Sequence, residues 1–339
     1  MKIAYLLPEI ACTNGRGDGI RNQAWTWASG LRSLGAQVEF LGPWSEPDWR
    51  SFDLVHFFSY YAGFENDARY IKNKFNIKIA VSPIVDSNRS PWMTRAASYL
   101  HAPRFHMYSP LGSLRKSRDD VDGWLVRSSY EGNYIQKAFG VSESSIFKVM
   151  LSTRIDSELA SNDMREDFCL LVCYLPSVRK NVMRLIQAAI IYGFRLVLVG
   201  SKISDEAYAG MMKVVEGHPN IEVRGWLPDE DLIKLYRRAR VFALPSLYEG
   251  VGLVALEAAS CGCDIVLTDR GAPKEYYNGM AALVDPLSVD AIGLAVKAFM
   301  EGKTYQPTLS NYIRSEHSQE KSAKELYAAY RAIIEGANR

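Results

Sequence analysis

Short apolar runs recur along the chain, and most are followed by a longer stretch with helical spacing. In the first half these runs are KIAYLLP, QVEFLG, DLVHFFS, IKIAVSP, GWLVRSS and IFKVML; in the second half they are CLLVCYL, RLVLVG, IEVRG, VFALPS and DIVLTD. Between the first two runs, Trp25, Ala28 and Leu31 recur at the spacing of one helix face. Unbroken apolar strands that alternate with helices are typical of parallel sheets covered by helices on both faces.

The alternation of strands and helices restarts after the polar stretch STRIDSELASNDMRED, residues 152–167. The chain has 339 residues, which is too long for one ordinary core and favours two domains. We therefore predict an α/β protein with two doubly wound, Rossmann-like domains, 1–160 and 161–310, that face each other across a cleft. Such sheets bind ligands at the carboxyl ends of their strands. The tail, 311–339, contains an amphipathic pattern and is expected to form a helix that packs back toward the N-terminal domain.

The composition excludes several classes of protein. An apolar share of 48% and a charged share of 23% indicate a globular protein, and a net charge of +2 gives no general case for nucleic-acid binding. The five cysteines show no metal-ligand spacing, which favours buried free thiols in a reducing cytosol. No apolar run approaches the roughly 18 residues of a membrane span, and the apolar start is shorter than the roughly 7–15 residues of a signal peptide core. We expect a cytoplasmic protein, so any membrane contact is peripheral.

Candidate chemistry is concentrated in PSLYEGVGLVALEAASCG, where a buried strand passes through a glycine-rich turn into an apolar helix. The first N–H groups of a helix have no partner within it and favour anions. Gly250 and Gly252 lack the Cβ atoms that would block a phosphate. The N–H groups of Val251, Gly252 and Leu253 are therefore predicted to face a bound diphosphate.

Two glutamates flank this turn. Glu257 lies about 7.5 Å along the helix from Gly252, which suits a carboxylate that accepts hydrogen bonds from a ribose. Glu249 lies on the other side of the turn, where a sugar on the far phosphate would present hydroxyls. The spacing fits a nucleoside diphosphate sugar, although two solvated glutamates beside a helix would give the same pattern.

With its surroundings, the stretch resembles the retaining GT-B glycosyltransferases of family 4, the "glycosyl transferases group 1" domain. The resemblance covers most of 165–335 and rests on GWLPDEDLIKLYRRARVFALPSLYEGVGLVALEAASCGCDIVLTD with its E-x7-E spacing, on GAPKEYY, on LVDP and on LYAAYRAI. It implies that Glu257 binds the ribose, that Glu249 contacts the donor sugar and that the EGVGL backbone holds sugar and phosphates. Val251 stands where the family usually has Phe.

The same family places an Arg and a Lys on the diphosphate from a loop that reads CYLPSVRKN here. Lys180 matches the lysine, whereas Tyr174 occupies the position of the arginine, so Arg179 is the candidate substitute. Two cations neutralise the leaving diphosphate in place of a metal ion, so no metal cofactor is expected. The alternative is a solvated RK pair, which the helix dipole disfavours.

The N-terminal half resembles the family less closely. Of Gly17 and Gly19, only Gly19 aligns with the glycine pair near the donor phosphates, and a plain loop is the alternative. The family often has a His after the fourth strand, but the corresponding VSPIVDSNRSP has none. Asp86 and Asn88 are the polar candidates there. RSSYEG and STRID resemble the end of the acceptor domain and the hinge.

A basic and aromatic segment, 89–118, carries five Arg, one Lys and no acidic residue. Such segments bind anionic membrane surfaces; a subsite for a phosphate-bearing acceptor and a plain exposed loop are the alternatives. The residues that would make this contact are Arg89, Trp92, Arg95, Arg104, Arg115 and Lys116.

Two further features have simpler readings. The D-x-D in DDVDG matches a motif that holds a divalent ion in other transferases, but a solvated turn is favoured. His56, in the strand DLVHFFS, is either a packed residue or a group near the strand's carboxyl end.

These observations predict a metal-independent, retaining glycosyltransferase. It would move a hexose-type sugar from a nucleoside diphosphate sugar to a hydroxyl of a glycan or lipid-linked acceptor in cell-surface polysaccharide synthesis. Glu249, Lys180, Arg179 and Asp86 are the catalytic candidates, and nucleic acid is not an expected partner. A nucleotide-sugar epimerase or hydrolase, a phosphorylase and a non-catalytic nucleotide-sugar-binding module are the alternatives.

Overall fold

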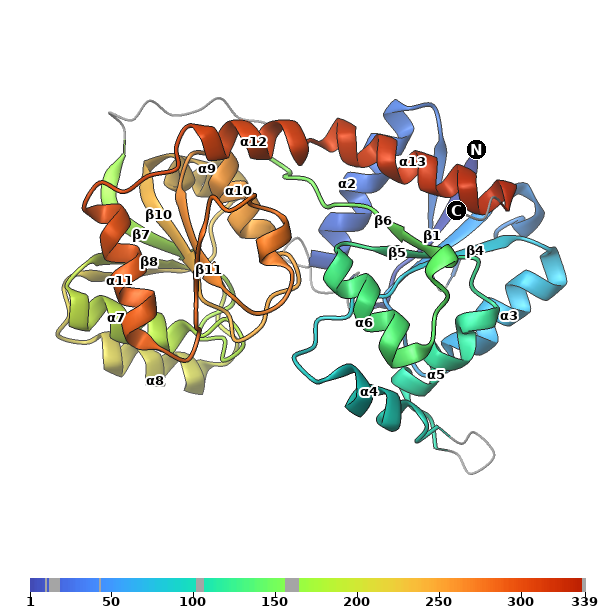
Figure 1. The fold of residues 1–339 in the computed structure, drawn as a ribbon, viewed down its shortest axis with the longest axis horizontal. Coiled ribbons are helices and arrows are strands. Elements are labelled where there is room, and N and C mark those ends of the chain that lie inside the picture. Colours follow the sequence, from blue (N-terminus) through green and yellow to red (C-terminus); the bar gives the residue numbers. More distant parts are fainter. Residues whose placement is uncertain (10, 12–18, 43, 102–106, 156–164, 337–339) are drawn as a thin grey trace. The chain divides into compact units, whose positions relative to one another are not determined.

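The computed structural model describes residues 1–9, 11, 19–42, 44–101, 107–155 and 165–336. The chain forms two compact units: 1–151 with 319–339, and 152–318 (Figure 1). The chain therefore changes units at 151–152 and 318–319. The sequence pattern had predicted the boundaries at 160–161 and 310–311. The tail differs from the expected single helix because it forms two, and the first of them buries Leu309 and Ile313 in the second unit.

The first unit has a six-stranded parallel sheet in the order β2-β1-β3-β4-β5-β6. The strands are β1 (Lys2–Leu6), β2 (Gln37–Leu41), β3 (Leu54–Phe58), β4 (Lys78–Ser82), β5 (Gly123–Val126) and β6 (Ile146–Lys148). The helices are α2 (Gly19–Ser33), α3 (Phe64–Phe75), α4 (Pro91–Ser98), α5 (Pro110–Lys116), α6 (Ser129–Phe139) and α13 (Gln319–Glu335). In the register of the sheet, Ala4 pairs with Glu39 of β2 and Val55 of β3. Every residue of β3 is buried, as expected for a central strand covered on both faces.

The C-terminal helix α13 lies against α2 in this unit (Figure 1). A Cβ atom added to Gly30 of α2 would lie 2.6 Å from the Cβ of Ala323. The glycine therefore permits the close approach of the two helices.

A buried polar network joins α13 to the sheet. His56 Nδ1 lies 2.6 Å from the hydroxyl of Tyr330, and its Nε2 lies 3.0 Å from Oγ of Ser82. The Tyr330 hydroxyl donates to that of Tyr5 at 3.0 Å. All four residues are buried or nearly so, and the burial holds the pKa of His56 well below its ordinary value. Of the two readings of His56, the structure supports the packed residue.

This network predicts a loss of stability in mild acid. The pKa of His56 is lowered in the folded state, whereas in the unfolded chain it has the ordinary value of about 6.5. Below that pH, the unfolded chain therefore binds more protons than the folded protein does. The stabilising effect of a neutral His56 is therefore complete above about pH 6.5 and is lost as the pH falls below it. When the pH is lowered from about 7.5 to about 5.5, we expect the urea midpoint of the wild type to decrease, and that of His56→Gln to decrease less. Tryptophan fluorescence measures both midpoints. An equal fall in both proteins would contradict the assignment.

The second unit also has a six-stranded parallel sheet, in the order β12-β11-β10-β7-β8-β9. The strands are β7 (Glu166–Val172), β8 (Arg195–Val199), β9 (Ile221–Arg224), β10 (Ala239–Leu244), β11 (Asp264–Thr268) and β12 (Ala282–Val284). The helices are α7 (Val182–Tyr192), α8 (Asp205–Val215), α9 (Asp229–Arg238), α10 (Leu253–Ser260), α11 (Val289–Met300) and α12 (Thr308–Glu316). The direction of the strand order reverses between β7 and β10. Ligands of doubly wound sheets bind beyond the carboxyl ends of the strands at such a point.

The prediction of two doubly wound parallel sheets is confirmed. Within the described residues, no helix combines the length and the apolar character needed to cross a membrane.

Candidate functional site

Two loops meet at the switch point of the second sheet: residues 173–181 follow β7, and residues 245–252 follow β10. Asn181 joins them, because its Nδ2 donates to the carbonyls of Pro245, at 2.9 Å, and Pro286, at 2.6 Å. The N–H of Leu247 donates to the carbonyl of Arg179 at 2.8 Å. Asn181 has a φ of 60°, a left-handed conformation that asparagine tolerates better than most residues. The loop that carries the predicted cations is thus fixed beside the glycine-rich turn.

Three of the predicted site residues come together here. Nζ of Lys180 donates to Oε2 of Glu249 at 2.6 Å, and Oγ of Ser246 donates to the same oxygen at 2.9 Å. Glu249 is buried, with 4% of its surface exposed. The Arg179 guanidinium is more distant, 3.9 Å from Oε1, and its side chain is 49% exposed. Lys180 is therefore the principal counter-ion of Glu249.

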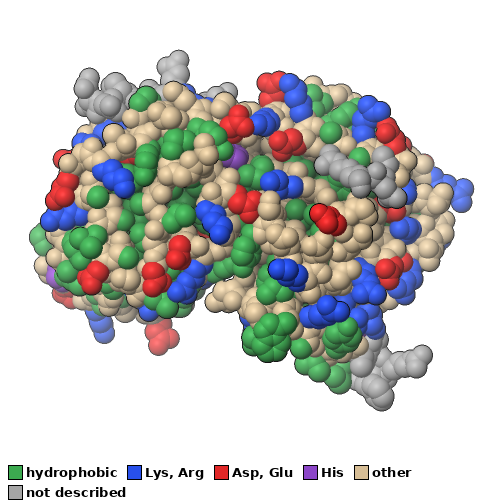
Figure 2. Space-filling view, viewed as in Figure 1, with side chains coloured by type: hydrophobic (Ala, Val, Ile, Leu, Met, Phe, Trp, Pro, Cys, Tyr) green, Lys and Arg blue, Asp and Glu red, His purple; other side chains and the backbone are tan. Residues whose placement is uncertain are grey.

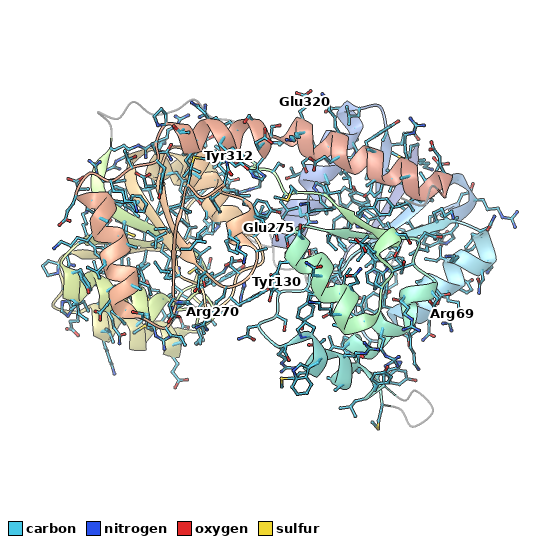
Figure 3. The ribbon with its side chains drawn as sticks, in the orientation of Figure 1. Arg69, Tyr130, Arg270, Glu275, Tyr312 and Glu320 are labelled. Atoms are coloured by element: carbon cyan, nitrogen blue, oxygen red, sulfur yellow. The ribbon has the colours of Figure 1, made fainter. Side chains whose placement is uncertain are left out.

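The glycine-rich turn is held by a neighbouring segment, 270–272, which includes Arg270 (Figure 3). The N–H of Glu249 donates to the carbonyl of Arg270 at 3.4 Å, and the N–H of Ala272 donates to that of Glu249 at 3.3 Å. Gly271 makes this pairing possible: its φ is 98°, and a Cβ atom there would lie 2.0 Å from the Glu249 carbonyl oxygen. The sequence analysis missed Gly271, because its GAPKEYY context gave no sign of this contact.

The same turn begins helix α10. Gly250, Val251 and Gly252 are buried, and Gly252, with a φ of 78°, is the N-cap residue. Leu253 is the first residue of the helix. Since a glycine cap has no side chain, the first N–H groups of α10 are left for another acceptor.

Glu257 occupies the next turn of α10 and is also buried, with 2% exposed. Nε of Arg154 donates to its Oε1 at 2.5 Å, and the hydroxyl of Tyr236 lies 3.4 Å from its Oε2. Burial by itself would lower the pKa of Arg154, but the charge and hydrogen bond of Glu257, together with the charge of Asp229, outweigh it and the pKa is raised. Arg154 is the main site residue that sequence reasoning missed. The sequence pointed to Arg154 only as the arginine of STRID, a stretch noted for its resemblance to the hinge and not for a role in the site.

The Cys173 thiol lies at the edge of this site, at the end of β7. Burial raises its pKa to about 12, although the nearby Lys180 acts in the opposite direction. The thiol is therefore neutral at physiological pH.

Residues 162–316 match the family model described as "Glycosyl transferases group 1". The match covers slightly less than half of the chain. The predicted family resemblance is thereby confirmed.

Among curated relatives, the O-antigen chain mannosyltransferase B of Escherichia coli is 38% identical over 86 residues, 25% of this chain and 23% of the relative. A serotype-specific mannosyltransferase of the same organism is 26% identical over 196 residues, 55% of this chain and 23% of the relative. The matches thus span about a quarter of the length of these relatives.

Solved structures show the GT-B fold over the whole chain. Sucrose-phosphate synthase from Thermosynechococcus elongatus superposes with a TM-score of 0.77 at 16% identity, covering 99% of this chain and all of the other. Anabaena Alr3699/HepE in complex with UDP gives 0.69 at 14% identity, covering 99% of both. The fold prediction is confirmed.

In the first unit, Asp86 lies just beyond the carboxyl end of β4. Its Oδ1 accepts from Nη2 of Arg127 at 2.8 Å. Arg127 also donates to the buried Glu131, through Nη2 at 2.8 Å and Nε at 3.0 Å. Burial alone would lower the pKa of Arg127, but Glu131 and Asp86 raise it well above its ordinary value. Arg127 and Glu131 had been noted only as part of RSSYEG.

The backbone beside this cluster is strained. Ile84, two residues before Asp86, has a φ of 50°, which is unusual for a β-branched residue. Strain of this kind concentrates at functional sites, which keeps Asp86 a candidate. Gly19 is the first residue of α2, whereas Gly17 lies outside the described residues.

The basic and aromatic segment forms a surface made of α4, α5 and the residues next to them, which we call the α4 surface. Its large apolar side chains are exposed: Trp92, Met93, Tyr99, Leu100, Met107 and Tyr108. Figure 2 shows hydrophobic side chains beside Lys and Arg at this end of the unit. Arg89 and Arg95 are exposed, and Arg115 and Lys116 are partly so. Arg104 lies outside the described residues.

Buried polar contacts anchor the α4 surface to the rest of the first unit. The hydroxyls of Thr94 and Tyr134 lie 2.6 Å apart, and Nε2 of His101 lies 2.9 Å from Oε1 of Glu65. The exposed aromatic residues are therefore carried by an anchored element.

The D-x-D motif forms ion pairs with nearby basic residues. Asp120 pairs with Arg69 at 3.0 Å, and Asp122 pairs with Lys72 at 3.1 Å and Lys78 at 3.3 Å. In the part of the chain that the structure describes, no three His, Cys, Asp or Glu side chains group as ligands for a metal ion.

Proposed function

We propose that this protein is a retaining glycosyltransferase that needs no metal ion. It transfers a hexose-type sugar from a nucleoside diphosphate sugar to a hydroxyl of a glycan or lipid-linked acceptor, in the synthesis of a cell-surface polysaccharide. The observation that carries the proposal is the Lys180–Glu249 pair at the switch point of the second sheet, 2.6 Å apart and next to the start of α10. The mannosyltransferase names of the relatives support the hexose donor and the polysaccharide product.

The geometry suggests how the donor is held. The diphosphate oxygens accept hydrogen bonds from the N–H groups at the start of α10. Lys180 neutralises the negative charge that develops on the diphosphate as it leaves the sugar. Glu249 accepts hydrogen bonds from the sugar hydroxyls, and Glu257 accepts those of the ribose. Arg179 assists from a more exposed position. Asp86 is proposed to contact the acceptor, which the first unit binds.

A nucleotide-sugar hydrolase or epimerase would also need a nucleotide-sugar site. Such an enzyme turns over its donor without an acceptor, whereas a transferase releases most of its nucleoside diphosphate only when an acceptor hydroxyl is present. A non-catalytic binding module would release none. Nucleotide release with and without acceptor glycans separates a transferase, a hydrolase and a binding module, and an epimerase is recognised by a changed sugar that stays on the nucleotide.

The donor site is tested by calorimetric titration of metal-free protein with UDP, GDP, ADP and dTDP. We expect one nucleotide to bind well, and Glu257→Ala to weaken it by roughly 1.5–3 kcal/mol, about 10- to 150-fold, because a hydrogen bond to a charged group is lost. Glu301→Ala, an exposed change at the end of α11, is the control and should have no effect. Binding by none of the four nucleotides, or equal binding by Glu257→Ala, would refute the donor site.

We further propose that the α4 surface rests on an anionic membrane face, where a lipid-linked acceptor would be found. Trp92, 71% exposed, and Tyr99, 58% exposed, would enter the interface while the arginines meet lipid phosphates. A phosphate subsite for the acceptor is the rival reading, but such a subsite would not require exposed aromatic side chains.

This contact predicts that the protein sediments with vesicles that contain phosphatidylglycerol but not with phosphatidylcholine vesicles, and less so in high salt. Trp92→Ala combined with Tyr99→Ala should abolish most of the binding. Trp44→Ala is the matched control, since Trp44 is 95% exposed in the same unit. If the double variant sediments as well as the wild type, the α4 surface is not the contact.

A further inference from the structure

Arg154 supplies the counter-charge of a buried carboxylate. Glu257 is 2% exposed, and Nε of Arg154 lies 2.5 Å from its Oε1. A buried carboxylate without a paired cation is strongly destabilised, so it tends to become protonated. Among the described residues, the other hydrogen-bond partner of the Glu257 side chain is the Tyr236 hydroxyl, which lies 3.4 Å from Oε2. Arg154 therefore balances the charge of Glu257 and fixes the direction in which its oxygens point.

The same guanidinium reaches a second element. Nη1 of Arg154 lies 3.6 Å from Oδ2 of Asp229, the first residue of α9. Asp229 follows the loop 225–228 beyond the carboxyl end of β9, the edge of the sheet where ligands of such folds bind and where we place the nucleobase. A planar guanidinium is suited to hold two carboxylates in a fixed geometry. Arg154 thus links the proposed ribose carboxylate to the proposed base loop.

The backbone around Arg154 is also anchored. The N–H of Thr153 donates to the carbonyl of His317 at 3.1 Å, and Oγ1 of Thr153 lies 3.4 Å from Oγ of Ser260 on α10. The chain passes between the units at 151–152 and returns at 318–319. We call the segments next to these two points, around Thr153 and around His317, the two crossing segments. They are hydrogen-bonded to each other beside α10, the helix that carries Glu257.

We infer that Arg154 is a positioning residue for the nucleotide end of the donor, and that it links nucleotide binding to the two crossing segments. It orients Glu257 for the ribose, and a ribose bound there restrains Arg154 and the backbone of residues 152–155. The inference rests on the proposed function. Arg154 contacts no reacting atom in this scheme, so it is not a catalytic residue.

The first test is a double-mutant cycle, measured by titration with the nucleotide that the wild type prefers. Arg154→Met should weaken nucleotide binding at least about tenfold. Arg154→Lys should weaken it less, because lysine keeps the positive charge but lacks the planar guanidinium that can bind two carboxylates at once. In a Glu257→Gln background, Arg154→Met should change affinity less than about threefold, because its partner no longer needs a counter-charge. Arg240→Met is the matched control: Arg240 is 34% exposed, against 28% for Arg154, and pairs with Asp167 at the other end of the sheet.

The second test separates positioning from a merely structural role. Saturating nucleotide should slow amide hydrogen exchange in peptides that cover 149–155 and 315–319 of the wild type. The slowing should be absent in Arg154→Met at saturating nucleotide. If Arg154→Met does not fold, as judged by circular dichroism, Arg154→Lys carries both tests and should show partial effects.

The outcomes distinguish two kinds of failure. If the wild type binds none of the nucleotides, the proposed donor site fails, and the inference with it. If the wild type binds and the Arg154 variants match it in affinity and exchange, the inference is overturned while the donor site stands. An effect of Arg154→Met that is as large in the Glu257→Gln background would also overturn it.

Discussion

Lys180→Ala is expected to lower the rate of sugar transfer about 100- to 1,000-fold, as removal of one donor to a developing negative charge does in other enzymes. The lysine is held at the switch point by the Asn181 contacts, so it is positioned before the donor arrives. Its present partner is Glu249, at 2.6 Å. A bound diphosphate would add a second, more highly charged partner, and this interaction strengthens as the bond to the sugar breaks.

The measurement is the release of nucleoside diphosphate from the preferred donor at saturating donor, with acceptor glycans present. Arg179→Ala is the comparison, and a smaller fall is expected because that side chain is 49% exposed and lies 3.9 Å from Glu249. Titration with the nucleotide alone should show a smaller loss for Lys180→Ala than the rate does. A larger fall for Arg179→Ala than for Lys180→Ala would reverse the assignment of the principal cation.

The strands and the glycine-rich turn were predictable because local pattern determines them. Five of the six strands of the second sheet correspond to apolar runs in the sequence, and Gly250 and Gly252 mark the turn between β10 and α10. The remaining strand, β12, has three residues and was not among those runs. The resemblance and the position of both loops at carboxyl ends of strands predicted that Lys180 and Glu249 lie in one site, but their direct hydrogen bond was not predicted.

The residues that were missed act through contacts with distant parts of the sequence. Gly271 matters because of the backbone of Glu249, and Arg154 because of a carboxylate 103 residues away. His56 shows the same limit, since its partners Tyr330 and Ser82 come from other elements. Helical periodicity in the tail likewise did not reveal that α12 and α13 pack on different units.

Arg127→Met is expected to destabilise the first unit by about 3–5 kcal/mol, the usual cost of removing one partner of a buried ion pair. Arg127 is 7% exposed and Glu131 is 3% exposed. Glu131 would keep the N–H groups of Val85 and Arg127 as donors, both at 2.8 Å, but would lose its counter-charge.

Urea unfolding followed by tryptophan fluorescence measures this change in the first unit, because only Trp226 of the seven tryptophans lies in the second. Arg127→Met combined with Glu131→Met should recover part of the stability, since two packed apolar side chains replace a buried ion pair at little cost. Arg69→Met is the control; its side chain is 51% exposed, and such surface pairs contribute about 0–1 kcal/mol. If Arg127→Met cost no more than Arg69→Met, the buried contacts of Arg127 with Glu131 and Asp86 would contribute no more than a surface ion pair. Arg127 would then not be the counter-charge that holds this cluster together, and the proposed fixed position of Asp86 toward an acceptor would lose its support.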